Sequence, residues 1–187
     1  MEEKVSLVLM LGTNRQDSES TKVAQFLLKE LKKRDEIETT FLDLHDVSIP
    51  QDNYGQDLKE HLKEYKEAIT QADGLIIVVP EYNHGYPGIL KSVLDSLYPE
   101  YERKAAGLVG VSAGPWGGTR VIENLIPVLK MLGLVVTASD LQFPNVKNLF
   151  DEDGDIVGKQ YNEHTEKFID TVVWLSKTLK WGRENLD

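Results

Sequence analysis

The sequence predicts an α/β protein with a doubly wound, five-stranded parallel sheet of strand order 2-1-3-4-5 and helices on both faces. Three observations predict this class. Short apolar segments alternate with longer amphipathic ones, the apolar segments are hydrophobic on both faces, and glycine-containing or polar loops follow several of them. Strands that are buried on both faces are typical of parallel sheets covered by helices.

The predicted strands are short and largely apolar. The first, VSLVLML, stops at Gly12; the second has Phe41 and Leu42 at its centre; and the third, GLIIVV, is apolar throughout. A short apolar run bounded by glycine or polar residues is the pattern of a buried strand. We expect strands at residues 5–11, 39–44, 74–79, 105–112 and 134–139.

The predicted helices carry their apolar residues on one face. In the first helix, Val23, Phe26, Leu27 and Leu31 recur at the spacing of one helix face. Gly133 follows the fourth helix where a C-cap glycine is expected. We expect helices at residues 20–34, 58–72, 89–98, 119–132 and 159–179.

Composition limits the classes of function. A length of 187 residues fits one domain spanning residues 1–187. The net charge of −10 disfavours nucleic acid and anionic membrane surfaces as partners, and the absence of cysteine excludes disulfides, thiolate catalysis and cysteine-ligated metals. No apolar run approaches the roughly 20 residues of a membrane span, and the acidic start lacks the positive charge of a signal peptide. We therefore expect a soluble, cytoplasmic protein.

The loop after the first strand has the composition of a phosphate site. It runs into a helix N-terminus and offers three hydroxyls and a guanidinium, those of Thr13, Ser18, Ser20 and Arg15. Free amides, hydroxyls and arginine all favour a phosphate group, provided that Asp17 and Glu19 point away. The alternative is simple N-capping by Ser18 or Ser20. The loop has neither the P-loop nor the G-x-G-x-x-G spacing, so ATP hydrolysis and a Rossmann dinucleotide site are unsupported.

Two further loops fall at the same edge of the predicted sheet. Residues 80–88 contain two prolines, two glycines and two tyrosines, a composition that suits either a cradle for an aromatic heterocycle or a structural turn. Residues 112–120 contain three glycines, which permit close approach of a ligand, and Trp116, which suits either a ring platform or surface packing. In parallel sheets, ligands bind at the carboxyl ends of the strands, where all three loops lie.

Other polar features carry weaker hypotheses. His84 is a candidate proton donor or a solvated loop residue, and Arg120 is a candidate contact for a dinucleotide phosphate. The remaining histidines show no metal-ligand spacing. The DEDGD segment at residues 151–155 does not have EF-hand spacing, so a turn is the better interpretation and no metal site is predicted.

The three loops together resemble those of the NADPH-dependent FMN reductase family of flavodoxin-like proteins. Pro80-Glu81-Tyr82-Asn83, continuing to Pro87, Leu90-Lys91-Ser92 and Asp95, is similar to the family signature P-E-Y-N-x-x-x-P-x-x-L-K-N-A-x-D. The first loop resembles the family's phosphate loop, the third resembles its glycine-rich flavin loop, and the turn after Phe150 resembles its late turn. Ser92 and Ser96 stand where the family usually has Asn and Trp, which concerns subunit contacts more than flavin binding.

The resemblance implies a reductase that uses bound FMN and takes hydride from NADPH or NADH. It implies passage of the hydride to a small-molecule flavin, quinone or similar acceptor, with no side chain acting as acid or base. It implies FMN contacts at Thr13, Arg15, Ser18, Ser20, Pro80, Glu81, Tyr82, Asn83, Gly85, Ser112, Gly114 and Gly117. It also implies a homodimer or homotetramer, for which the aromatic residues Tyr98 and Tyr101 suit an interface. A flavodoxin-type electron carrier and a flavodoxin-like binding module without FMN are the alternatives.

Overall fold

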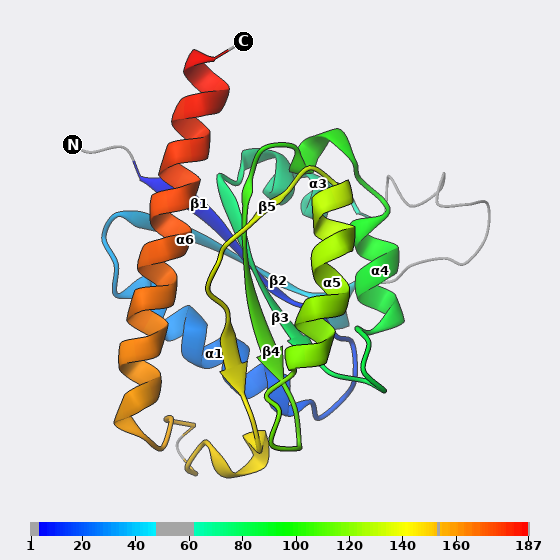
Figure 1. Ribbon diagram of the computed structural model, residues 1–187, viewed down its shortest axis with the longest axis vertical. Helices are drawn as coiled ribbons and strands as arrows, with labels where there is room; N and C mark the ends of the chain where they lie inside the picture. Colours follow the sequence, from blue (N-terminus) through cyan, green and yellow to red (C-terminus); the bar gives the residue numbers. More distant parts are fainter. Residues whose placement is uncertain (1–3, 48–61, 153, 187) are drawn as a thin grey trace.

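The strands follow the predicted order. The computed structural model describes residues 4–47, 62–152 and 154–186, and its strands lie in the order β2-β1-β3-β4-β5 with parallel pairing throughout (Figure 1). They are β1 (Val5–Leu11), β2 (Ile37–Asp43), β3 (Gly74–Pro80), β4 (Ala105–Val111) and β5 (Val135–Val136). The order confirms the prediction. The chain adds β2 on one side of β1 and then β3, β4 and β5 on the other side, so the switch in strand order lies between β1 and β3.

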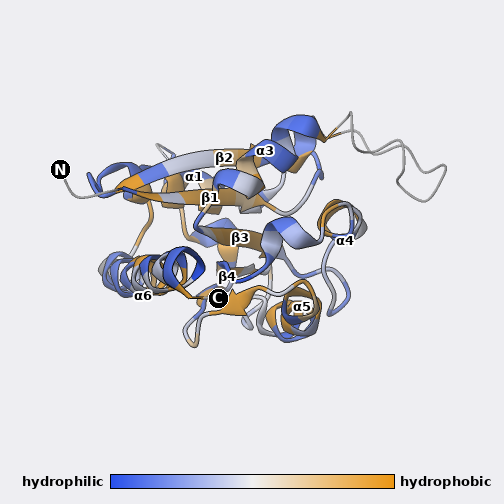
Figure 2. Cartoon of the chain, turned by 90° about the horizontal axis from the view of Figure 1, so that it is seen from above, coloured by the Kyte–Doolittle hydropathy of each residue, from blue (hydrophilic) through white to orange (hydrophobic). Residues whose placement is uncertain are grey.

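Helices cover both faces of the sheet (Figure 2). They are α1 (Glu19–Lys32), α3 (Lys63–Gln71), α4 (Gly88–Leu94), α5 (Thr119–Met131) and α6 (Lys159–Asn185). Buried residues of α1 and α6 pack on one face, while those of α3, α4 and α5 pack on the other. Alternate residues of β1 enter the two cores, Leu7 and Leu9 one of them and Val8 and Met10 the other, which explains the continuous apolar run. No helix in the described ranges is long and apolar enough to cross a bilayer.

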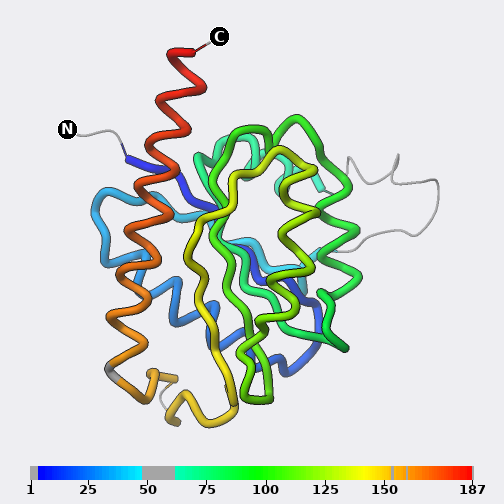
Figure 3. Tube along the Cα trace, in the orientation of Figure 1, coloured from blue at the N-terminus to red at the C-terminus, as the bar shows by residue number. Residues whose placement is uncertain are grey.

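The predicted fifth strand is wrong in its extent, and a sixth strand was missed. After β5 the chain leaves the sheet and returns as β6 (Leu141–Phe143), which pairs with the later part of β4 (Figure 3). Between them, the Thr137 N–H still donates to the Ala106 carbonyl of β4, and the Thr137 hydroxyl donates to the Ser139 carbonyl, beyond which the chain leaves β4. Leu141 and Phe143 are buried while Gln142 is exposed, so the strand has the expected alternation, but it is too short to stand out in the sequence.

The helix after β3 is shorter than predicted. It ends at Leu94, and a separate 3-10 turn, η3 (Pro99–Tyr101), follows. A proline disfavours helical geometry in the residue before it, so the helix cannot continue through Tyr98. Tyr101 is fully buried, and its hydroxyl is hydrogen-bonded to that of Tyr65. This corrects the expectation that Tyr101 serves an interface. Tyr98 is 58% exposed.

The last helix is longer than predicted, because tertiary contacts hold its final turns. The Arg183 guanidinium donates to Asp73 Oδ1 at 2.9 Å and to the Arg103 carbonyl at 2.7 Å. Asp73 is buried at the start of β3, so α6 stays helical past Gly182 to Asn185.

The remaining boundaries agree with the sequence to within a few residues. Residues 58–61 of the predicted second helix lie outside the described ranges. Gly133 has φ +82°, as a residue after a helix C-cap often does. The DEDGD turn is confirmed: Gly154 donates to the Asp151 carbonyl, and Phe150 pairs with Ile156, while Asp153 lies outside the described residues.

Candidate functional site

A pocket of about 300 Å³ lies at the carboxyl ends of β1, β3 and β4. This is the edge at which open α/β sheets bind ligands, beside the reversal of strand order. The pocket brings together residues from all three predicted loops. Of the predicted site residues, those that line it are Arg15, Ser18, Ser20, Pro80, Glu81, Tyr82 and Ser112.

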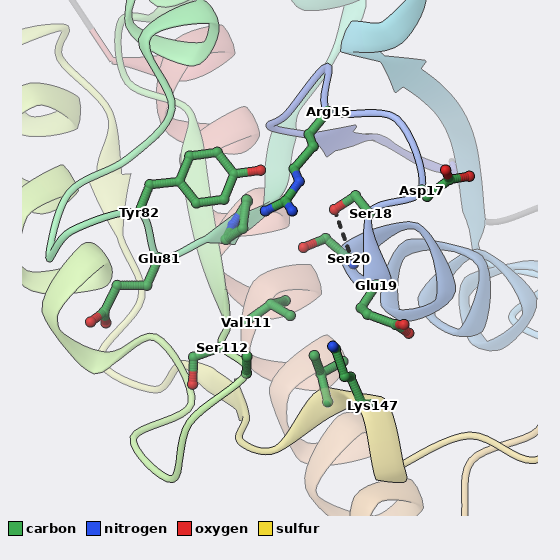
Figure 4. Close-up of a pocket in the computed structure, with 13 residues that line it drawn as sticks. Arg15, Asp17, Ser18, Glu19, Ser20, Glu81, Tyr82, Val111, Ser112 and Lys147 are labelled. Atoms are coloured by element: carbon green, nitrogen blue, oxygen red, sulfur yellow. Dashed lines mark hydrogen bonds between the residues drawn. The ribbon is translucent and has the colours of Figure 1, made fainter.

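The first wall of the pocket is the N-terminus of α1. Ser18 is the N-cap residue, and its hydroxyl accepts a hydrogen bond from the Ser20 N–H at 3.3 Å. The capping alternative is therefore correct for Ser18, but the same residue also faces the pocket (Figure 4). The helix dipole makes this end of α1 attractive to anions, while the Ser20 and Thr21 N–H groups already donate to the hydroxyl and the carbonyl of Ser18.

Charges of both signs surround this wall, because Asp17 and Glu19 line the pocket together with Arg15. The Arg15 side chain points into the pocket, whereas the Asp17 carboxylate points away from it (Figure 4). Glu19 is paired with Lys22 at 2.9 Å, which offsets its charge. No carboxylate of the described residues lies within ion-pair distance of Arg15. The guanidinium therefore stands available for an anionic ligand.

Thr13 does not line the pocket but holds its loops together. It is 1% exposed, and its hydroxyl lies 3.0 Å from the Tyr82 hydroxyl. The same Thr13 oxygen accepts a hydrogen bond from the Arg15 N–H at 3.2 Å. Thr13 thus lies outside the pocket lining, where its hydroxyl contacts Tyr82 and the Arg15 main chain.

The second loop is a tight hairpin. Tyr82 and Gly85 exchange two backbone hydrogen bonds of 2.9 Å, and the two residues between them, Asn83 and His84, both have positive φ. Positive φ at both central positions is what a type I′ turn requires. Because the Glu81 N–H also donates to the Val111 carbonyl, the donors that this part of the loop offers to a ligand are the amides of Asn83 and His84. Asn83 and Gly85 lie outside the pocket lining.

A charged pair lies on the outer side of this hairpin. Arg120 is 3.5 Å from Glu81 Oε1, and its guanidinium lies 5.3 Å from the centre of the Trp116 ring. Glu81 Oε2 is buried and has no hydrogen-bond partner among the residues described. Trp116 is 61% exposed, so its ring packs against the Arg120 guanidinium at the surface and does not belong to the core.

The third loop is tied to a segment that the sequence analysis did not connect with the site. The Ser112 N–H donates to the Phe143 carbonyl, the Val146 N–H donates to the Ser112 carbonyl, and the Asn145 N–H donates to the Gly114 carbonyl. These bonds fix the loop against β6 and the short 3-10 turn η4 (Val146–Asn148). Gly114 and Gly117 do not line the pocket themselves.

The two glycines of this loop have different roles. A Cβ on Gly114 would meet nothing within 4 Å, so this glycine leaves open space. A Cβ on Gly117 would lie 2.8 Å from Gln142 Cβ, and φ at Gly117 is +61°. Gly117 therefore permits the loop to pack on β6, a role different from close approach of a ligand.

Val146 and Lys147 are pocket residues that the sequence analysis missed. Val146 is buried, and Lys147 extends its ammonium group toward Glu19 and Ser20 across the pocket (Figure 4). No carboxylate in the described ranges pairs with Lys147. These residues follow β6, and only the similarity of the late turn to the family pattern pointed to this part of the chain.

The residues present fit the phosphate end of a flavin mononucleotide. Arg15 and Lys147 supply two cations, Ser18 and Ser20 supply hydroxyls, and α1 supplies its N-terminus. These are the donors that bind a phosphate dianion. No group of three or more potential metal-ligating side chains occurs in the part of the chain described.

Comparison with known proteins decides the family. The sequence profile of the NADPH-dependent FMN reductase family matches residues 5–148, which include all three loops and η4. The chain belongs to the NADPH-dependent FMN reductase family. It is thus an oxidoreductase that uses FMN and a reduced nicotinamide cofactor, as its sequence predicted.

Relatives of this family match over different lengths. A 2-hydroxy-1,4-benzoquinone reductase of a Burkholderia species is 27% identical over 186 residues, covering 96% of this chain and 97% of its own. An FMN-dependent NADPH-azoreductase of Staphylococcus aureus is 29% identical over 136 residues, covering 69% of this chain and 72% of its own.

Solved structures confirm the fold. The flavoenzyme NAD(P)H:(acceptor) oxidoreductase FerB of Paracoccus denitrificans superposes with a TM-score of 0.78 at 23% identity, covering 93% of this chain and 98% of its own. An NADH:FMN oxidoreductase in its apo form superposes with a TM-score of 0.69 at 24% identity, covering 88% of each chain.

Proposed function

We propose that this chain is an NADPH:quinone-type reductase whose FMN phosphate is held between α1 and η4. The observation that carries the proposal is the pair of cations, Arg15 and Lys147, that face each other across a pocket at the N-terminus of α1. Their charges match the two negative charges of a phosphate monoester near neutral pH. The substrate class follows from the relative that matches along nearly its whole length, a benzoquinone reductase.

Each predicted residue then has an assigned part. Arg15, Lys147, Ser18 and Ser20 bind the phosphate, while Thr13 and Tyr82 hold the loops at the correct separation. Pro80, the amides of Asn83 and His84, and Ser112 border the ring, and Gly114 leaves room beside it. Glu81 and Gly85 shape the hairpin through their backbone bonds, and Gly117 packs the third loop.

The protein supplies position and electrostatics, and the cofactor supplies the redox chemistry. When bound, FMN would supply the hydride-transfer chemistry between NADPH and an acceptor. No side chain in the pocket has the geometry of a paired acid and base, so we assign no catalytic residue. Arg120, on the exposed Trp116, is our candidate contact for the phosphate of NADPH.

We also propose that the protein forms a homodimer or homotetramer. Tyr98 is 58% exposed beside the end of α4, although Tyr101 is buried and takes no part. A large exposed aromatic residue is typical of an interface core. Light scattering at micromolar concentration tests this proposal, and a monomeric mass would contradict it.

An anaerobic titration tests the function. The apoprotein is loaded with FMN, its visible spectrum is recorded, and NADPH is added without oxygen, followed by 1,4-benzoquinone. We expect bleaching of the flavin band by NADPH and its return on addition of the quinone. A band that NADPH cannot bleach would contradict the reductase. A band that NADPH bleaches but the quinone does not restore would contradict only the acceptor class.

A further inference from the structure

A histidine outside the pocket lining holds the backbone of the phosphate loop. His45 Nε2 lies 2.8 Å from the Arg15 carbonyl oxygen, and His45 Nδ1 lies 2.6 Å from Asp43 Oδ1. His45 belongs to the short turn η1 (Leu44–Asp46), directly after β2. Because β2 pairs with β1, this turn lies beside the loop that follows β1.

Both contacts of the imidazole ring are to groups that only accept hydrogen bonds. A main-chain carbonyl has no proton to donate, and neither has an ionised carboxylate. A neutral imidazole has one N–H and can serve one of these acceptors, whereas an imidazolium has two and serves both. The geometry therefore selects the protonated form of His45.

The electrostatic surroundings of the ring act in the same direction. Hydrogen bonding to the Arg15 carbonyl, and then to Asp43, raises the pKa of His45 above its ordinary value. Asp43 and Asp46 on its own turn also favour the positive charge. From the loop after β1, the ring contacts the main-chain carbonyl of Arg15. The Arg15 guanidinium points into the pocket (Figure 4).

The main chain of Arg15 is thus hydrogen-bonded at both its N–H and its carbonyl. Its N–H donates to the Thr13 hydroxyl at 3.2 Å, and its carbonyl accepts from His45 at 2.8 Å. These two bonds fix the main chain from which the Arg15 side chain enters the pocket. Asp43 also holds the backbone of His45, because its Oδ1 accepts a hydrogen bond from the main-chain N–H of His45 at 2.9 Å.

We propose that protonated His45 is a positioning residue for the FMN phosphate: it holds Arg15 in place to bind the phosphate. On deprotonation the single remaining N–H goes to the Asp43 carboxylate, which is the stronger acceptor, and Arg15 is released. This inference rests on the proposed function, since it concerns the same phosphate site. The contribution of His45 to FMN affinity should be complete while His45 is protonated. It should be lost as the pH rises through the raised pKa of His45.

Fluorescence titration of FMN into the apoprotein tests the proposal between about pH 6 and pH 9.5, a range that brackets the ordinary pKa of histidine. The variants are His45→Ala, which removes both contacts, and His45→Gln, which keeps one donor without a charge. His164→Gln, an exposed histidine on α6, is the matched control. At each pH the Kd of a variant is divided by that of the wild type, which cancels the ionisation of FMN itself.

We expect His45→Ala to bind FMN about three- to tenfold more weakly at the acidic end, the range for one hydrogen bond. The ratio should fall toward one at the alkaline end. His45→Gln should recover part of the loss at the acidic end, and its ratio should fall below one at the alkaline end, where the amide still donates and the neutral wild-type ring no longer holds Arg15. His164→Gln should give a ratio of one throughout. Riboflavin, which lacks the phosphate, should bind the wild type and the His45 variants equally.

Several results would overturn the proposal. One is a ratio for His45→Ala that stays at one or does not change with pH, and another is an equal loss of riboflavin affinity. If the variants do not fold, the wild-type protein still gives an answer by NMR of its histidine rings. A His45 pKa that is not raised above the ordinary value of histidine, or that does not rise further on FMN binding, refutes the role. Absence of FMN binding by the wild type at every pH would refute the proposed function itself, whereas normal binding with a flat ratio refutes only the role of His45.

Discussion

The hydroxyl oxygens of Thr13 and Tyr82 lie 3.0 Å apart and connect the loop after β1 to the loop after β3. Thr13 is buried, and its oxygen also accepts the Arg15 N–H, so one side chain couples the two walls of the pocket. The two loops that we propose for the two ends of a flavin nucleotide are therefore joined before any ligand binds. Such preorganisation reduces the entropy lost on binding.

Removal of this link should weaken cofactor binding. We expect Tyr82→Phe to weaken FMN binding by about 0.5–1.5 kcal/mol, the net contribution of one neutral hydrogen bond. The measurement is the Kd from flavin fluorescence quenching. Tyr86→Phe in the same loop is the control, because the structure gives its hydroxyl no partner among the described residues. Equal Kd values for Tyr82→Phe and the wild type would show that the link does not contribute.

The two pocket cations should contribute unequally. Arg15→Ala should weaken FMN binding by about 1.5–3 kcal/mol, the range for a hydrogen bond to a charged group. Lys147→Ala should weaken it by about 0.2–1 kcal/mol: both side chains are exposed, but an ammonium group lacks the bidentate hydrogen-bond geometry of a guanidinium. Riboflavin affinity should be unchanged in both variants. An Arg15→Ala protein that binds FMN like the wild type would remove Arg15 from the phosphate site.

Gly118 should tolerate no side chain. Its φ is +83°, and a Cβ there would lie 2.7 Å from the Val111 nitrogen. We expect Gly118→Ala to lower the free energy of unfolding by more than about 2 kcal/mol, because backbone strain and a clash with β4 combine. Gly114→Ala is the matched control in the same loop, where a Cβ has open space, and should change stability by less than about 1 kcal/mol. Urea denaturation distinguishes the two, and equal stabilities would refute the account.

Lys104 should make stability depend on alkaline pH. It is 6% exposed, its ammonium group donates to the Ile69 and Thr70 carbonyls, and burial lowers its pKa to about 8. Between about pH 8 and pH 10.5, the ordinary pKa of lysine, the unfolded chain holds more protons than the folded one, so this residue should raise stability as the pH increases.

The predicted gain from Lys104 is about 1–3 kcal/mol across that range, since each pKa unit corresponds to about 1.4 kcal/mol. Urea denaturation at several pH values measures it, and Lys104→Met, which cannot titrate, is the comparison. Other groups titrate in both proteins, so the difference between the two slopes isolates Lys104. Parallel slopes would show that Lys104 keeps its ordinary pKa in the folded state.

Local sequence predicted most of the fold because the strands and helices have clear patterns. The run at β1 is apolar at every core position, and α1 has one apolar face bounded by the capping Ser18. The errors occur where a distant contact overrides the local pattern. The salt bridge between Arg183 and Asp73 extends α6, and β6 is a strand of three residues that is stable only because it pairs with β4.

The sequence by itself determined the sheet order, the family and three loops at one edge, because strand patterning and loop motifs are local properties of the chain. Only the tertiary structure decided which of those residues face the pocket. It placed Thr13 beneath the loop, brought Lys147 to the pocket from a segment after β6, and set His45 against the Arg15 carbonyl. These relationships depend on the pairing of β2 with β1 and of β6 with β4, which joins residues far apart in the chain.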